Sequence, residues 1–251
     1  MTVLFVLLGL LVGGMVNQLG SDLPARRGLT QPHCPYCGRV RPWWQWLSLP
    51  TYLIRHAGCP YCGAPIGLRH PLAEIGLAVA YGHLWIMLGP SVKLILYLLY
   101  STIFVLILIT DIERRLILNV VMYPSILLAI VVSFLPLEMT GMRYEYALAG
   151  GAIGFAFFLV AALVGNLLFG SGALGGGDVK LAAFVGLITG FPLVIEALVL
   201  TILIGGAVSL ILLVTRVRSL RDPIPYGPFL IAGAIITLLW GHPIAAWFIY
   251  R

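Results

Sequence analysis

Acidic and other charged residues are scarce in this chain of 251 residues. Asp and Glu together number nine, and charged residues make up 10% of the sequence against 61% hydrophobic residues. A soluble globular domain carries about 25% charged residues, so this composition excludes an ordinary water-soluble protein. The first apolar run, residues 1–19, also lacks the basic start and the small-residue cleavage pattern of a removable signal peptide. We therefore expect it to be a retained membrane helix.

Further apolar runs approach the roughly 20 residues that cross a bilayer core. They cover residues 71–88, 92–110, 116–135, 146–169, 181–214 and 228–250. As one helix, the run 181–214 would be about 51 Å long, against a hydrocarbon core of about 30 Å. Gly190-Phe191-Pro192 interrupts it, because proline removes a backbone donor and glycine tolerates a turn. The sequence thus predicts an all-α, polytopic membrane protein with about eight transmembrane helices.

The distribution of Lys and Arg predicts the orientation, because these residues favour cytoplasmic loops. With eight helices and the N-terminus outside, twelve of the fifteen basic residues are cytoplasmic; with seven helices, ten are. Eight crossings are therefore favoured. Topology also explains the pI of about 9.3, because the positive charge is spread over loops and forms no continuous stripe for nucleic acid.

All four cysteines lie in the one substantial hydrophilic segment, residues 20–70. They form two Cys-x-x-Cys pairs, separated by the twenty-one residues 38–58: Cys34, Cys37, Cys59 and Cys62. Two such pairs can complete a closed, structural tetrahedral zinc site, and a reducing cytoplasm disfavours the alternative of disulfides. His33 and His56 flank the pairs, but with four thiolates available we do not expect them to bind the metal. The segment Trp43–Pro50 suits either a headgroup-level element or a small core around the metal.

Two aspartates, Asp111 and Asp178, fall at predicted membrane boundaries on the same cytoplasmic side. A carboxylate near hydrocarbon is costly and usually functional, and two that lie close together can share a proton and act as base and acid. Taken alone, Asp111 is interpreted as a solvated interfacial carboxylate, and Asp178 as a cap of the next helix. The glycines at 175–177 favour catalysis, because they allow a substrate backbone to approach closely. We therefore expect an intramembrane aspartyl peptidase.

Several motifs together resemble the bacterial type IV prepilin peptidases over nearly the whole chain. Gly175-x-Gly177-Asp178-x-Lys180 is similar to that family's G-x-G-D-x-K motif, which also resembles the GxGD signature of presenilin-type proteases. Asp111 stands where the family's first catalytic aspartate follows helix three. The paired cysteines, Arg69–Glu74 and Pro225–Leu230 also match their family counterparts in order. Asp22-Leu23-Pro24 departs from the family, which usually has a basic residue at the first of these positions.

The resemblance implies a bacterial inner-membrane enzyme that cleaves the basic leader from prepilins or pseudopilins at the cytoplasmic face. It further implies N-methylation of the new N-terminus with S-adenosylmethionine, although no S-adenosylmethionine motif is visible, so a peptidase without methyltransferase activity stays an alternative. Gly175 and Gly177 are substrate-contact candidates. Lys180 could bind substrate or anchor the helix, and Glu74 could serve recognition or methyl transfer or cap its own helix.

Two other classes of protein fit the sequence less well. A transporter with a proton relay needs ionisable groups at several depths, whereas both aspartates lie near one face. A noncatalytic assembly scaffold would use the cysteine segment to bind partners. The absence of H-E-x-x-H argues against a metalloprotease. We expect residues 1–19 to form the first helix, 20–70 the zinc loop and 71–251 the peptidase core. The sequence does not predict an oligomeric state.

Overall fold

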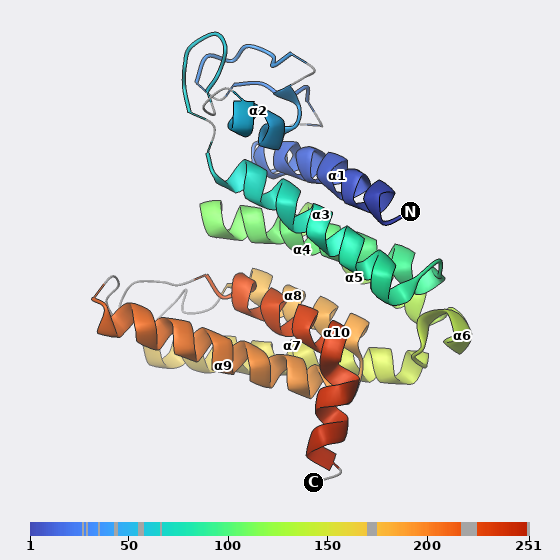
Figure 1. Cartoon of the computed structure of the whole chain (residues 1–251). Helices are drawn as coiled ribbons and strands as arrows, with labels where there is room; N and C mark the ends of the chain where they lie inside the picture. Colours follow the sequence, from blue (N-terminus) through green and yellow to red (C-terminus); the bar gives the residue numbers. More distant parts are fainter. Residues whose placement is uncertain are drawn as a thin grey trace. The chain divides into compact units, whose positions relative to one another are not determined.

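The computed structural model describes residues 1–26, 28, 30–34, 36–42, 45–54, 58–65, 67–169, 175–216 and 225–249; of residues 54, 169 and 242–249 only the backbone is described. The chain divides into two compact units, Met1–Thr110 and Asp111–Arg251. The described residues form helices, turns and two isolated β-bridges (Figure 1). The predicted all-α class is therefore confirmed, whereas the predicted division at residues 19 and 70 stays a prediction.

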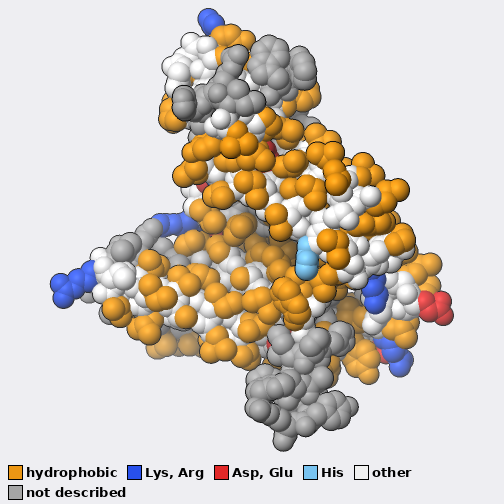
Figure 2. Space-filling view, viewed as in Figure 1, with side chains coloured by type: hydrophobic (Ala, Val, Ile, Leu, Met, Phe, Trp, Pro, Cys, Tyr) orange, Lys and Arg blue, Asp and Glu red, His pale blue; other side chains and the backbone are white. Residues whose placement is uncertain are grey.

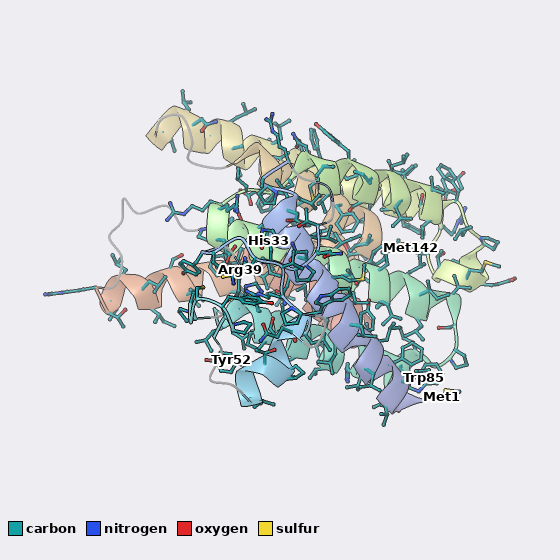
Figure 3. All side chains as sticks on the ribbon, turned by 90° about the horizontal axis from the view of Figure 1, so that it is seen from above. Met1, His33, Arg39, Tyr52, Trp85 and Met142 are labelled. Carbon is teal, nitrogen blue, oxygen red and sulfur yellow. The ribbon has the colours of Figure 1, made fainter. Side chains whose placement is uncertain are left out.

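The first unit contains α1 (Thr2–Asp22), α2 (Ser48–Ile54), α3 (Arg69–Leu88) and most of α4 (Val92–Arg114). Helices α1 and α3 pack side by side (Figure 1). Small residues allow their backbones to meet, since a Cβ at Gly13 would lie 2.6 Å from the Cα of Glu74. At the other end of the pair, Phe5 stacks on Trp85 with ring centroids 4.5 Å apart, beside Met1 in Figure 3.

The second unit contains α5 (Asn119–Ser133), α6 (Leu137–Thr140), α7 (Tyr144–Phe169), α8 (Gly176–Thr189), α9 (Leu193–Val214) and α10 (Gly227–Ile249). The predicted break at Gly190-Phe191-Pro192 is confirmed, because α8 ends at Thr189 and α9 begins at Leu193. Gly190 has a φ of +70°, which glycine adopts without strain. In the run 116–135 the helix begins only at Asn119, since the extended backbone of Leu118 precedes it.

Five of the described helices, α1, α3, α4, α7 and α9, are long and apolar enough to cross a membrane. Helix α5 and the stretch Gly227–Gly241 of α10 are apolar but shorter. Hydrophobic side chains cover much of the visible helical surface, as Figure 2 shows. Such a surface is costly in water and typical of a protein embedded in lipid. A multi-pass membrane protein is thus confirmed.

Helices α7 and α8 approach each other so closely that their backbones touch. A Cβ on Gly186 would overlap the carbonyl oxygen of Gly150, and a Cβ on Gly154 would overlap that of Ala182. Small residues permit this packing between membrane helices. The contact fixes α8, and with it the residues at the start of α8, against α7.

We expect Gly186→Leu to lower the free energy of unfolding by about 3 kcal/mol, because the new side chain must separate two backbones in contact. Gly206→Leu is the matched control, since a Cβ on Gly206 in α9 meets nothing within 4 Å. Thermal unfolding of the detergent-purified protein, followed by circular dichroism, measures both. Equal midpoints for the two variants would contradict this account of the packing.

Candidate active site

Asp111 lies in the last turn of α4, and its side chain is only 5% exposed. The helix ends at Arg114, and Arg115 follows with a φ of +52°. The backbone N–H of Gly227, the first residue of α10, interacts with the Asp111 carboxyl group. A helix N-terminus favours a nearby anion, so α10 supplies an electrostatic partner for this carboxylate.

Gly227 has no room for a side chain, because a Cβ there would overlap Oδ2 of Asp111 and lie 3.1 Å from its Cγ. Glycine at this position therefore lets the start of α10 reach the carboxylate. The sequence shows the surrounding motif, Pro225–Leu230, but gives no reason to place it beside Asp111. The structure thus adds Gly227 to the residues that form the site.

Asp178 is the third residue of α8, lies in its first turn and is 9% exposed. Its carboxyl group interacts with the backbone N–H of the N-cap residue Gly175, as a side chain at the third helical position does in a capping box. A Cβ on Gly175 would lie 3.3 Å from Oδ2 of Asp178. Capping and burial therefore occur together at this aspartate.

The two aspartates lie close enough for their charges to interact. Oδ2 of Asp111 and Oδ1 of Asp178 are both buried, and neither has a hydrogen-bond partner among the described residues. A buried carboxylate oxygen without a donor is costly. One proton or one water molecule held by both groups would satisfy these atoms, and that is the arrangement in which two carboxyl groups act as acid and base.

The glycines before Asp178 have different surroundings. A Cβ on Gly177 would lie 2.7 Å from the Cβ of Ile117, in the segment that joins α4 to α5, whereas a Cβ on Gly176 meets nothing within 4 Å. Gly177 therefore allows the first turn of α8 to pack on the residues that follow Asp111. This packing role is independent of the substrate contact expected from the sequence, which stays a prediction.

Lys180 connects the start of α8 to α5. Its Nζ donates a hydrogen bond of 2.6 Å to Oδ1 of Asn119 and lies 5.0 Å from the centroid of the Tyr123 ring. A cation over an aromatic face contributes about 0.5–1 kcal/mol at an exposed site. The structure thus gives Lys180 an anchoring role within the protein.

We expect Lys180→Met and Asn119→Leu each to lower the free energy of unfolding by about 1 kcal/mol, because each removes the same hydrogen bond. The double variant should lose little more than either single variant. Chemical denaturation in detergent measures this double-mutant cycle. Additive losses would show that the two residues stabilise the protein independently.

Glu74 is fully buried in the first unit, on α3. Its carboxylate accepts backbone hydrogen bonds from Ser48, at 2.7 Å, and Leu49, at 2.8 Å, and Nδ2 of Asn17 lies 3.4 Å from its Oε1. Asn17 also donates to the carbonyl oxygen of His70 at 2.9 Å. Glu74 therefore caps another helix, α2, which neither sequence interpretation anticipated. Its proposed part in recognition or methyl transfer stays a prediction.

The four cysteine sulfurs form one cluster, with all four ligand atoms within 4.8 Å of one another. Cys34 Sγ lies 3.7 Å from Cys62 Sγ, and Cys37 Sγ lies 3.9 Å from Cys59 Sγ. A tetrahedron with metal–sulfur bonds of about 2.3 Å has edges of about 3.8 Å. The sulfurs, none of them in a disulfide, are thus arranged as a four-thiolate zinc site requires.

The two copies of Cys-Pro-Tyr-Cys-Gly end in the same kind of turn at their glycines. Gly38 and Gly63 have φ values of +69° and +70°, and each donates its N–H to the carbonyl of the first cysteine of its copy at 2.9 Å. Burial opposes ionisation of Cys59, but hydrogen bonds from the N–H groups of Tyr61 and Cys62 and from the thiols of Cys62 and Cys34 together lower its pKa to about 6. Such donors favour the thiolate, the form that binds a metal.

Other polar residues fix the cysteine segment in place. The guanidinium of Arg39, which follows the first copy, lies 5.2 Å from the centroid of the Tyr61 ring in the second copy. Asp22, the residue that departs from the family pattern, accepts hydrogen bonds from the N–H and Oγ1 of Thr30 at 2.8 and 2.9 Å. His33, labelled with Arg39 in Figure 3, lies outside the sulfur cluster and 3.4 Å from Thr30 Oγ1. His56 lies outside the described residues.

Comparison with known proteins matches the sequence of this chain to bacterial leader peptidases. Residues 97–210 match the type IV leader peptidase family, and residues 7–88 match the bacterial peptidase A24 N-terminal domain. The chain is 28% identical over 254 residues to the prepilin leader peptidase/N-methyltransferase of Bacillus subtilis, covering 99% of this chain and 98% of that protein.

Two further proteins of the same name are similar. That of Pseudomonas aeruginosa is 28% identical over 95% of this chain and 90% of its own length. That of Myxococcus xanthus is 30% identical over 86% of this chain and 64% of its own length. No solved structure matches the chain.

Proposed function

We propose that this chain, which belongs to the bacterial type IV prepilin leader peptidase/N-methyltransferase family, is a membrane aspartyl endopeptidase. Its substrates are prepilins or pseudopilins, from which it removes the leader peptide. The observation that carries the proposal is the buried pair Asp111 and Asp178, each with a carboxylate oxygen that lacks a hydrogen-bond partner among the described residues.

The chemistry follows from two carboxyl groups that share one proton. The ionised group accepts a proton from a water molecule, whose oxygen attacks the scissile carbonyl carbon. The protonated group then gives its proton to the leaving amine as the C–N bond breaks. Because the pair titrates as one system, the roles of base and acid belong to the pair and are not assigned to either residue. Gly227 N–H and Gly175 N–H hold the two groups in position.

The second activity named for the relatives is N-methylation. Cleavage exposes an N-terminal amine, and S-adenosylmethionine is the methyl donor that we propose as co-substrate. In its reaction, the amine nitrogen forms a bond to the methyl carbon, the sulfonium–methyl bond breaks, and the amine loses a proton. A peptidase that does not methylate is the second candidate, because the sequence contains no visible S-adenosylmethionine motif.

The four-cysteine cluster is proposed as a structural zinc site. Cys34, Cys37, Cys59 and Cys62 would hold the ion, and the sulfur separations fit that geometry. Bound there, zinc would fix the two copies of Cys-Pro-Tyr-Cys-Gly against each other. With four thiolate ligands no position is left for water or substrate, so zinc would supply structure and would take no part in hydrolysis.

We also propose eight membrane crossings with the N-terminus outside the inner membrane. The eight helices of 14 residues or more in the described chain support this number. The predominance of Lys and Arg in the loops of one side supports the orientation. The cysteine segment and both aspartates then face the cytoplasm, where a basic leader peptide is accessible.

The test is to incubate the detergent-purified protein with a prepilin, with and without S-adenosylmethionine, and to weigh the products by mass spectrometry. The proposal expects mature-length pilin in both reactions and the added mass of one methyl group only with the donor. Mature pilin that never gains this mass would establish the peptidase without methylation. No cleavage in either reaction would favour the transporter or scaffold interpretation.

A further inference from the structure

The segment Gln45–Leu53 consists of a turn, Gln45–Leu47, followed by helix α2, and it exposes several apolar residues while it buries polar ones. Trp46 and Leu53 are 50% and 77% exposed, and Pro50 between them is also exposed. Pro50 and Leu53 are three residues apart and lie on one side of α2, whereas Trp46 belongs to the turn before the helix. Ser48 and Thr51 lie on the other side of α2 and, like Gln45 in the turn, are buried to 95% or more. A helix at the surface of a water-soluble protein has the reverse arrangement.

The turn before α2 packs against α1, and α2 itself packs on α3. A Cβ on Gly14 of α1 would lie 3.1 Å from a methyl carbon of Leu47 and 3.4 Å from the carbonyl oxygen of Trp46. Gly14 precedes the end of α1 at Asp22 by eight residues, which is about 12 Å along a helix.

Backbone donors at the start of α2 are satisfied without water. Glu74 accepts the N–H groups of Ser48 and Leu49, and the next residue, Pro50, has no N–H to satisfy. The hydroxyl of Thr51 donates to the carbonyl of Leu47 at 3.1 Å. The first N–H groups of a helix normally bond to water or caps. In hydrocarbon every such group needs a partner within the protein.

We propose that α2 and the turn before it are embedded in one leaflet of the bilayer and that their outward face, Trp46, Pro50 and Leu53, is covered by lipid acyl chains. Three observations support lipid as the occupant: the inverted polarity of this segment, the contact of its turn with α1 about 12 Å from the end of a candidate span, and the protein-internal capping of α2 by Glu74. The outward face of α1 is likewise apolar, since Leu8, Leu11 and Met15 are exposed. Lipid along α1 would therefore continue onto α2.

The inference decides between the two sequence interpretations of the tryptophan-rich segment. Its described part packs on α1 and α3 and turns an aromatic residue outward, so it forms a membrane-contacting element and not a core around the metal. This arrangement explains why the carboxylate of Glu74 is buried, because Glu74 caps a helix that water does not reach. This inference rests on the membrane spans and is independent of peptidase activity.

The test uses the full chain in lipid nanodiscs, with a spin-labelled amino acid incorporated genetically in place of Leu53. Controls carry the same label in place of Leu11 on the outward face of α1 and of Tyr36, which is 73% exposed in the cysteine segment. Collisions with oxygen report hydrocarbon, and collisions with a water-soluble nickel complex report solvent. We expect the label at 53 to match that at 11, with high oxygen and low nickel accessibility.

Two results would overturn the proposal. Nickel accessibility at 53 equal to that at 36 would place α2 in water. Low accessibility to both reagents would mean that protein, either another part of this chain or a second copy, covers the helix. Circular dichroism of each labelled protein, compared with the unlabelled chain, establishes that the label has not unfolded it. Prepilin cleavage measured on the same samples separates failure of this inference from failure of the proposed enzymatic function.

Discussion

Replacing Asp178 by asparagine should lower the rate of prepilin cleavage about a thousand-fold, which corresponds to about 4 kcal/mol of transition-state stabilisation. Asparagine keeps the size of the side chain and can still accept from Gly175 N–H, but it neither gains nor loses a proton at working pH. Asp111→Asn should have a similar effect. The double variant should not lose a further factor of about a thousand relative to the single variants, because the effects of residues that act as one catalytic unit are not additive.

Glu113→Gln is the matched control for these variants. Glu113 is an exposed carboxylate two residues after Asp111 on the same helix, α4. Its substitution removes the same charge from the same region and should leave the rate unchanged. Cleavage rates come from purified protein and a prepilin under single-turnover conditions. If Asp178→Asn cleaved as fast as Glu113→Gln, the pair would not be catalytic.

Serine in place of Cys34 or Cys59 should abolish stoichiometric zinc binding. Both thiols are buried within the cluster, and removing one leaves three ligands and an open position. Structural zinc contributes about 10 kcal/mol or more to the folding of small zinc domains. We therefore expect the segment that contains the cysteines to lose its fold locally and to become sensitive to protease. Elemental analysis and limited proteolysis measure the two effects.

His33→Ala is the control for the metal site. His33 neighbours Cys34 in sequence but lies outside the sulfur cluster, so this variant should keep its zinc. Zinc content that is unchanged after both Cys34→Ser and Cys59→Ser would refute the site. Zinc lost on His33→Ala, but kept on Cys34→Ser, would assign the metal to another set of ligands.

The positions of the long helices could be predicted because lipid imposes a simple rule on length and composition. The break at Gly190-Phe191-Pro192 follows from backbone chemistry alone. Helix α2 could not be predicted in this way, since Ser48–Ile54 is too short for periodicity to be decisive. Its formation depends on Glu74, which lies far away in the sequence, and on the side of α1. Contacts of this kind leave no local signal.

The residues of the candidate site likewise divide into those that the sequence predicts and those whose contacts only the structure shows. Asp111 and Asp178 stand out in the sequence because acidic residues are scarce, and the repeated Cys-Pro-Tyr-Cys-Gly indicates the metal cluster. Lys180 and Gly177 stand out equally, but only coordinates show that one bonds to Asn119 and the other packs on Ile117. The approach of Gly227 to Asp111 joins residues more than a hundred positions apart. The sequence alone shows the motif Pro225–Leu230 but does not show that this motif contacts Asp111.

The direct backbone contact between α7 and α8 affects how the enzyme meets its substrate. With the carbonyl of Gly150 against Gly186, α8 can neither slide nor rotate without losing its closest packing. Asp178 lies in the first turn of this same helix, so under the proposed function its carboxyl group would be oriented before any peptide arrives. Binding energy from the substrate would then not be consumed in ordering the side chain and would remain available to the transition state.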